Sequence, residues 1–347
     1  MSHASNPPDQ LQIKEDLFVS FVSEESDRPI LTWLFATANV VVYLLMAWIS
    51  PRPFSQAIVD MDPATLLRWG AKFGPYVWQG EFWRVLTAVF LHGGLLHLFF
   101  NSWALLNIGP AVEYLYGHAK FTVIYLGAGI LGNAASLAFS DSLSIGASGA
   151  IFGIFGGLIY LAIRIPGREG RRLWLQLLVP LGYNVAYGFA SPNIDNFAHL
   201  GGLAGGFALS YVVGLPAPGP TVRGPSVGRR MTSALLVVAM AAVVAGSVRL
   251  PHAWYTHFEQ GNRFFQNGDY RRAAEEYATA ARQNGKVPEI QFNLALSYIK
   301  LGRIDDARTA LKAALSISPG FRDASELLQQ LETVHRFFGK GSSPAAP

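Results

Sequence analysis

The sequence predicts an all-α, polytopic membrane protein that is followed by a soluble helical domain. Of its 347 residues, 51% are hydrophobic and only 14% are charged, whereas soluble proteins carry about 25% charged residues. Seven stretches contain no Asp, Glu, Lys or Arg, and each reaches or approaches the roughly 20 residues that cross a bilayer as a helix. These stretches are Pro29–Ser50, Val85–Val112, Phe121–Ser140, Ser142–Ile163, Leu173–Ile194, Asn196–Val222 and Met231–Val248.

The chain opens on a polar segment over residues 1–28. This segment includes Asp9, Glu24 and Asp27 and shows no basic start followed by a short apolar core. We therefore expect no cleaved signal peptide. The remaining boundaries follow from the changes in composition. We expect a membrane core of six helices over 29–214, a basic linker over 215–230, a seventh membrane helix over 231–250, a soluble helical domain over 251–338 and a disordered tail over 339–347.

Basic residues beside the predicted spans indicate the orientation of the chain. One cluster lies between spans four and five, and another between spans six and seven: Arg164, Arg168, Arg171 and Arg172, then Arg223, Arg229 and Arg230. The positive-inside rule places both clusters in the cytoplasm. Strict alternation then predicts a cytoplasmic N-terminus and an extracytoplasmic domain after Arg249. The outward connection departs from the rule, because it carries Arg52, Arg68, Lys72 and Arg84.

The formal net charge of +4 does not indicate a nucleic-acid partner, since these cations lie beside membrane spans. The lipid bilayer is the partner that they predict. The chain has no Cys, which excludes disulfides and thiolate metal sites. We expect no cofactor and no metal.

The segment after the seventh span contains an internal repeat. Residues Gly268–Ala273 and Gly302–Ala307 match at an offset of 34. Further pairs keep that offset, namely Gly261 with Ala295, Phe264 with Tyr298, Tyr277 with Leu311 and Ala280 with Ala314. This pattern resembles the tetratricopeptide repeat, which implies two helical hairpins and a last helix, about Asp323 to Phe338, that caps them. We expect a concave surface for a peptide or protein partner or for self-association, the alternative being two hairpins without a ligand.

Polar groups inside membrane spans are costly, so each indicates a functional site by default. His92, His97 and Asn101 lie in span two, Ser148 near the start of span four, and His199 in span six. A Ser hydroxyl becomes a nucleophile when an imidazole within hydrogen-bond reach takes its proton. His97 and Asn101 are four residues apart and share a helix face, where they can donate to a developing oxyanion. His92 would lie about 140° further round the same helix.

These residues occur in motifs that resemble those of the rhomboid family of intramembrane serine proteases. The sequence GASG at 146–149 resembles the family's G-x-S-G motif, and AHLGG at 198–202, continuing to Gly206, resembles A-H-x-x-G-x-x-x-G. His97 and Asn101 match H-x-x-x-N, with His92 at the family's preceding His. Two further matches are the W-R pair Trp83-Arg84 and the G-x-x-x-E-x-x-x-G motif at Gly109–Gly117. The resemblance covers roughly Pro29 to Gly214, in the expected order and spacing.

The resemblance implies a six-helix rhomboid core and assigns a role to each matching residue. Ser148 would be the nucleophile and His199 its general base and acid. His97, Asn101 and the Ser148 backbone N–H would form the oxyanion site. The supporting residues would be His92, Gly146, Gly149, Phe152, Trp83, Arg84 and Glu113. The family uses a Ser–His dyad, often with a Tyr where this chain has Phe152.

Physical arguments favour the same arrangement. A fourth span that begins at Ser148 would aim its free N–H groups at a developing oxyanion. Glycines at 149, 153 and 157, and at 201, 202, 205 and 206, would allow spans four and six to pack closely. Asp195 stands one turn before His199 and could orient it, although an Asp at the start of a helix is more often a cap. The Trp- and Tyr-rich connection around Phe54–Phe82 is expected to lie at the membrane interface.

The sequence therefore predicts an intramembrane serine endopeptidase that cleaves transmembrane protein substrates within or near their membrane-spanning segment. We expect it in a bacterial inner (cell) membrane, with the repeat domain recruiting substrates or partners. One alternative is a catalytically silent rhomboid-like protein that binds transmembrane segments. Another is a membrane scaffold that displays the repeats.

Overall fold

The computed structural model describes residues 28–191, 194–214 and 227–338, with side chains described as far as Thr333. The chain forms two compact units, Met1–Arg249 and Leu250–Pro347. Three predicted segments fall wholly or largely outside the described residues: the polar segment over 1–28, the basic linker over 215–230 and the tail over 339–347. Residues 227–230 of the predicted linker are described and begin a helix.

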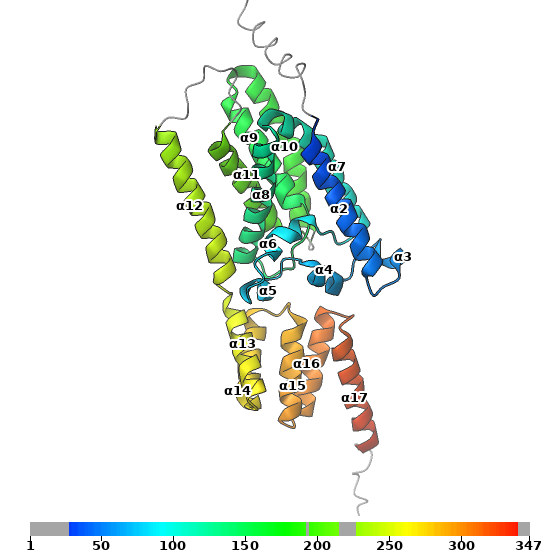
Figure 1. The fold of residues 1–347 in the computed structure, drawn as a ribbon. Coiled ribbons are helices and arrows are strands. Elements are labelled where there is room, and N and C mark those ends of the chain that lie inside the picture. The colour runs from blue at the N-terminus through cyan, green and yellow to red at the C-terminus, as the bar shows by residue number, and fades with distance from the viewer. Residues whose placement is uncertain (1–27, 192–193, 215–226, 339–347) are drawn as a thin grey trace, which may run out of the picture. The chain divides into compact units, whose positions relative to one another are not determined.

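The first unit is a bundle of long helices interrupted by a segment of short ones (Figure 1). The long helices are α2 (Ile30–Ile49), α7 (Leu95–Tyr116), α8 (His118–Phe139), α9 (Ser148–Arg164), α10 (Gly167–Ala190), α11 (Asn196–Val213) and α12 (Val227–Arg249). The short ones, between α2 and α7, are α3 (Phe54–Ala57), α4 (Pro63–Trp69), α5 (Gly74–Trp78), α6 (Arg84–Thr87) and the 3-10 turn η1 (Ala88–Phe90).

Each of the seven long helices overlaps one of the seven predicted spans, but the bounds differ. Helix α9 begins six residues later than its stretch, and α10 begins six residues earlier and includes Arg168, Arg171 and Arg172. Helix α7 begins at Leu95, ten residues after the charge-free stretch begins, because α6, η1 and an extended Gly94 occupy the first part of that stretch. His92 therefore lies before the helix, and its predicted position about 140° round from His97 is wrong. Gly94 is extended with φ −178°, and a Cβ there would lie 2.9 Å from the Val59 carbonyl oxygen.

Length and composition alone identify four helical stretches of the described chain that could cross a membrane. These are Ile30–Ile49, Leu95–Tyr116, His118–Phe139 and the stretch Val227–Gln266, which begins with α12. The shorter α9 is apolar as well. Nearly all of α9 is buried, since its exposed positions are confined to its last turn. A helix that is apolar and buried all round lies at the centre of its bundle.

Helix α11 packs against α8 on one side and α9 on another through two separate rows of glycine. A Cβ on Gly202 would lie 2.0 Å from the Gly149 carbonyl oxygen, and one on Gly206 would lie 2.0 Å from that of Gly153. The other row faces α8, where a Cβ on Gly201 would lie 2.4 Å from the Ala135 Cβ. The backbones of α9 and α11 are therefore in direct contact, as small-residue packing in membranes allows.

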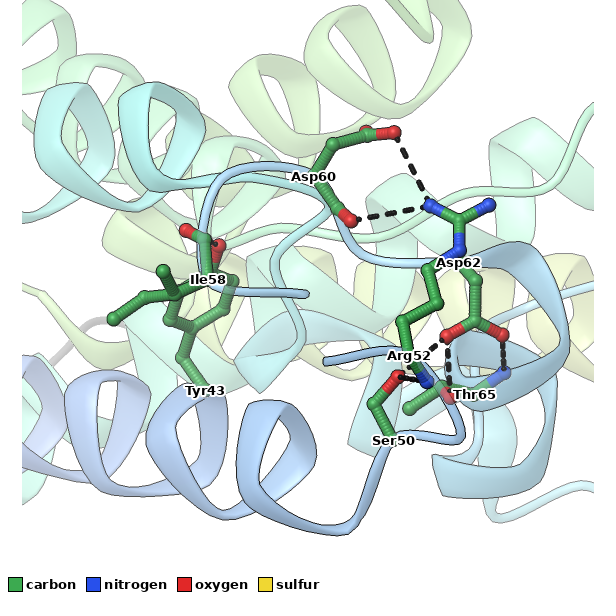
Figure 2. Close-up of polar contacts among 7 residues, drawn as sticks. All are labelled: Tyr43, Ser50, Arg52, Ile58, Asp60, Asp62 and Thr65. Atoms are coloured by element: carbon green, nitrogen blue, oxygen red, sulfur yellow. Dashed lines mark hydrogen bonds and ion pairs between the residues drawn. The ribbon is translucent and has the colours of Figure 1, made fainter. Parts of the chain in front are cut away.

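The segment that follows α2 is folded by its own polar contacts (Figure 2). Asp62 caps α4, since its Oδ1 accepts from the Thr65 N–H at 2.8 Å, and its Oδ2 accepts from the Thr65 and Ser50 hydroxyls at 2.7 and 3.0 Å. Partial burial raises the pKa of Asp62, but these hydrogen bonds and the nearby Arg52 outweigh it and hold the pKa below its ordinary value. Asp62 is therefore ionised and fixes the path of the chain into α4.

The second unit consists of two helical hairpins and a fifth helix, in chain order α13 (Ala253–Gln266), α14 (Tyr270–Gln283), α15 (Pro288–Lys300), α16 (Ile304–Ile317) and α17 (Arg322–Phe338). Gly268 and Gly302 form the two hairpin turns with φ of 79° and 75°. Gly261 lies against the Tyr277 ring, and a Cβ there would be 2.7 Å from it. Ala273, Ala295 and Ala307 are fully buried between the helices.

Within the described residues the chain forms helices and isolated bridges but no strand. The prediction of an all-α chain, with apolar helices followed by a helical-repeat region, is confirmed.

Candidate active site

Ser148 is the first residue of α9. The connection that leads to it turns at Gly146, whose φ of +114° is in the left-handed region, and the Gly146 N–H donates to the Ala88 carbonyl at 2.9 Å. No side chain caps the start of α9, where Ala147 is the N-cap. The backbone N–H groups of the first turn, that of Ser148 among them, therefore have neither a partner within the helix nor a capping side chain.

His199 lies in the first turns of α11, and its Nε2 is 2.8 Å from the Ser148 Oγ. The Phe152 ring, one turn after Ser148, stacks on the imidazole with ring centroids 4.3 Å apart and planes 11° apart. Direct backbone contact between α9 and α11 holds the two helices at the separation that this hydrogen bond requires. Stacking limits rotation of the imidazole about its own axis.

Asp195 acts as a helix cap and does not hydrogen-bond the His199 ring. Its Oδ1 accepts from the Ala198 N–H at 3.0 Å, which caps α11. The His199 Nδ1 is buried and has no hydrogen-bond partner among the described residues. The arrangement is thus a Ser–His pair in which the carboxylate fixes the helix that carries the imidazole.

His97 and Asn101 lie on one face of α7 and border Gly146. A Cβ added at Gly146 would lie 2.7 Å from the His97 Nε2 and 3.6 Å from the Asn101 Nδ2. Asn101 is 6% exposed and donates from Nδ2 to the His97 carbonyl at 3.1 Å. Both donor side chains therefore reach the turn that leads to Ser148.

His92 is fully buried beside this pair. Its ring packs edge-on against the His97 ring, with centroids 5.1 Å apart. It makes no contact with Ser148 or His199 that the structure records, so its position fits support of the His97 ring.

Arg84 holds together the segment of short helices between α2 and α7. The guanidinium donates from Nη1 to the Leu67 and Ala71 carbonyls at 2.5 and 3.2 Å, and it pairs with Glu81 at 2.7 Å. It is 5% exposed. The Trp83 ring packs over Gly70, where a Cβ would lie 2.3 Å from it.

Glu113 joins the end of α7 to the start of α2. Its carboxylate accepts from the backbone N–H groups of Leu31 and Thr32 at 2.9 and 2.8 Å and from the Thr32 hydroxyl at 2.6 Å. It also lies 2.5 Å from the His118 Nδ1. Sequence reasoning did not single out Thr32, although a Thr at the start of an otherwise apolar helix was an available signal.

The repeat unit contains a separate small cavity of about 100 Å³, lined by Asn262, Phe265, Gln266, Tyr277, Asn293 and Leu296. Burial raises the pKa of Tyr277 to about 12, so its hydroxyl stays protonated and donates to the Asn262 Oδ1 at 2.8 Å. Asn293 donates to the same oxygen at 3.2 Å. The lining thus combines oriented amides with apolar surface.

Comparison with known protein families gives two matches. A Rhomboid domain matches residues 79–216, which contain Ser148, His199, His97 and Asn101. A Tetratricopeptide repeat matches residues 258–320.

Curated relatives agree with these matches. The chain is 35% identical over 297 residues to the rhomboid protease GluP of Bacillus subtilis, which covers 85% of the chain and 56% of GluP. It is 39% identical over 189 residues to the rhomboid relative YdcA of the same bacterium, covering 53% of the chain and 88% of YdcA. It is 32% identical over 199 residues to RHOMBOID-like protein 7 of Arabidopsis thaliana, of which it covers 63%. The chain thus spans little more than half the length of GluP.

The matched domain and the relative that the chain covers almost completely lead to one conclusion. The chain belongs to the rhomboid family, as an integral membrane protein whose rhomboid domain is followed by a tetratricopeptide-repeat region.

Proposed function

We propose that this protein is an intramembrane serine endopeptidase that uses Ser148 as nucleophile and His199 as general base and acid. The observation that carries the proposal is the 2.8 Å contact between the His199 Nε2 and the Ser148 Oγ. This contact lies at the N-terminus of α9, beside two further donor side chains. Nucleophile, base and oxyanion donors are the three parts that acyl transfer needs.

The reaction begins when the Ser148 Oγ attacks a substrate peptide carbonyl while the His199 Nε2 accepts its proton. The carbonyl oxygen becomes an oxyanion, which His97, Asn101 and the Ser148 backbone N–H stabilise. The imidazolium then gives its proton to the leaving amine, and an acyl-enzyme on Ser148 remains. A water molecule, deprotonated by His199, hydrolyses that ester and restores the free hydroxyl.

Transmembrane protein substrates are the class that fits this site. The names of the relatives support the reaction class, since GluP is described as a rhomboid protease. The dyad sits between helices of a membrane bundle, so a substrate presents its peptide bond within or near its own membrane span. The repeat unit recruits substrates or partners, and its amide-lined cavity supports a peptide-binding role.

The orientation that we propose is a cytoplasmic N-terminus and an extracytoplasmic repeat domain in a bacterial inner (cell) membrane. Arg168, Arg171 and Arg172 lie together at the start of α10, and the positive-inside rule assigns such a cluster to the cytoplasm. Ser148, at the opposite end of the preceding helix, then faces the outer side.

Cleavage of a single-span substrate by purified protein in detergent tests the function. Wild-type protein should cleave a substrate with small residues near its membrane boundary, and Ser148→Ala and His199→Ala should not. Ser233→Ala, which alters a serine on α12 away from the site, should cleave like wild type. Undiminished cleavage by Ser148→Ala would overturn the proposed mechanism and favour a silent binding protein or a scaffold.

A further inference from the structure

Lys72 is the most unusual ionisable residue of the segment between α2 and α7, because its side chain is completely buried. It lies between α4 and α5, and the whole connection over 51–84 carries three other basic residues. Lysine is almost never fully buried unless it is paired, since an ammonium loses its hydration on burial. Its partners therefore indicate what keeps it there.

The backbone of Lys72 pairs with the connection between α8 and α9. The Lys72 N–H donates to the Ser144 carbonyl at 3.0 Å, and the Ser144 N–H donates back to the Lys72 carbonyl at 2.8 Å. Ser144 stands two residues before Gly146 and four before Ser148. These two hydrogen bonds therefore hold the α8–α9 connection, which leads to Ser148, against the segment between α2 and α7.

The ammonium group joins two further elements. Lys72 Nζ donates to the Ser136 Oγ on α8 at 2.6 Å and to the Ser142 carbonyl at 2.8 Å. It also lies 3.9 Å from the Asp195 Oδ2. The Ser136 hydroxyl in turn donates to that same carboxylate oxygen. Two hydrogen bonds and one ion pair thus occupy an ammonium group that has three protons to donate.

Asp195 links Lys72 to α11, the helix that carries His199. Its Oδ1 caps α11 through the Ala198 N–H, and its backbone carbonyl accepts from the His199 N–H at 3.1 Å. A shift of Asp195 therefore shifts the first turn of α11, and the imidazole lies in that part of the helix.

We propose that Lys72 is a positioning residue. It sets the distance between Ser148 and His199, because it joins the α8–α9 connection to the capped start of α11. This inference rests on the proposed proteolytic function. It assigns no chemical step to Lys72, since the ammonium contacts neither the Ser148 Oγ nor the imidazole. A misplacement of about 1 Å between reacting groups costs about 10²-fold in rate.

Burial lowers the pKa of Lys72 from an ordinary value of 10.5 to about 8, although Asp195 and Asp141 act in the opposite direction. These two carboxylates are the charged groups that face it, Asp195 from the start of α11 and Asp141 from the connection after α8, while α8 itself presents the neutral Ser136. Lys72 is charged below about pH 8 and loses its attraction to Asp195 above it. The kcat of the wild type should therefore fall as the pH rises through that value.

Stability should change in the opposite sense. Because the pKa of Lys72 is lower in the folded protein, the unfolded chain binds more protons between about pH 8 and 10.5. The contribution of Lys72 to the free energy of unfolding therefore rises with pH over that interval. A fall in kcat without a matching loss of stability separates loss of positioning from unfolding.

The test compares Lys72→Met with Arg68→Met, which removes an exposed cation from the same segment. Cleavage of a single-span substrate and thermal unfolding are measured on the full chain in detergent. Lys72→Met should lower kcat by about 10²-fold with a much smaller change in KM, and its kcat should no longer fall as the pH passes 8. Arg68→Met should retain the wild-type kcat and pH profile.

Two further variants keep the test decisive if Lys72→Met unfolds. Ser136→Ala removes only the intermediate hydroxyl and should give a smaller loss of kcat. Adding Asp195→Asn to Lys72→Met removes the carboxylate left without its cation, so the double variant should lose less than the sum of the two single losses. Wild-type kcat and pH profile in Lys72→Met, or in Ser136→Ala where Lys72→Met does not fold, would overturn the positioning role. Failure of the proposed function looks different, because Ser148→Ala would then cleave like wild type.

Discussion

Asn101 and Asn107 on α7 make the same hydrogen bond within the helix, but only Asn101 lies beside the candidate site. Asn101 and Asn107 each donate from Nδ2 to the carbonyl four residues earlier, at 3.1 and 2.6 Å. Asn101 is buried beside Gly146, whereas Asn107 is exposed. Of these two residues, only Asn101 lies where it could donate to the oxyanion that we propose next to Ser148.

Asn101→Ala should therefore lower kcat by about 10²–10³-fold, which is the usual effect of removing one oxyanion donor. The loss should be smaller than that of Ser148→Ala, since His97 and the backbone N–H remain. Single-turnover cleavage in detergent measures both. Asn107→Ala is the control and should cleave like wild type, and an equal loss in both Asn variants would contradict the assignment.

Gly146 is the position where backbone conformation and site geometry meet. Its φ of +114° disfavours any other residue, and a Cβ there would press on the His97 ring. Gly80 has a comparable φ of +107° but nothing within 4 Å of its Cβ position. The two glycines thus share a backbone conformation, but only Gly146 has a side chain packed against its Cβ position.

We predict that Gly146→Ala and Gly80→Ala both lose about 1–3 kcal/mol of stability from backbone strain. Only Gly146→Ala should also lose cleavage activity, because it displaces His97. Thermal unfolding and kcat are measured for each variant. Normal kcat in folded Gly146→Ala would exclude the proposed place of His97 in the oxyanion site.

The sequence indicated the residues that carry chemistry better than the residues that hold them. Ser148, His199, His97 and Asn101 stand out because each is polar within an apolar stretch. Lys72 does not, since it lies in a loop that carries other basic residues and its burial depends on distant segments. Thr32 is polar within an apolar stretch, but its contact with Glu113 depends on the packing of α2 against α7. His92 was placed on the helix of His97 because the charge-free pattern does not reveal that α7 begins only after Gly94.

At the scale of elements, α11 is organised by its two glycine rows. One row contacts α9 and the other contacts α8, so the helix has a fixed rotation about its axis. That rotation directs His199 toward Ser148. The sequence predicted close packing at these glycines, but it did not predict which row meets which helix, because neighbouring spans are not specified by spacing alone.

Gly206→Ala tests this packing away from the reacting atoms. Its Cβ would lie 2.0 Å from the Gly153 carbonyl oxygen, so α9 and α11 must separate. We expect a loss of about 1–3 kcal/mol in the free energy of unfolding, as overpacking usually gives, and a lower kcat. Gly246→Ala on α12, with nothing within 4 Å, should keep both. Equal stability of the two variants would show that α9 and α11 are not in direct backbone contact at Gly206.

At the scale of the whole molecule, the chain combines a membrane unit that ends at Arg249 with a repeat unit that begins at Leu250. The combination of these two units in one chain was predictable from the sequence, because composition changes abruptly after the seventh span and the 34-residue offset indicates the repeat. The ligand of the repeats was not, since their cavity is formed by residues from three different helices.

Deletion of residues 251–347 should spare cleavage of a generic single-span substrate, because the dyad lies wholly within the membrane unit. Cleavage of the physiological substrate should weaken, since the recruitment that we propose for the repeats is lost. Competition between the two substrates in membranes that contain either form measures the difference. Loss of generic cleavage in a folded deletion variant would assign the repeats a structural role instead.

Covalent labelling tests most directly whether His199 activates Ser148. A fluorophosphonate reagent that reacts with activated serines is added to the protein in detergent, and the modified peptide is identified by mass spectrometry. If His199 activates Ser148, the wild type forms an adduct on Ser148, His199→Ala reacts much more slowly and Ser148→Ala forms none. An adduct on Ser148 that forms equally fast in His199→Ala, or an adduct on another serine alone, would contradict this activation.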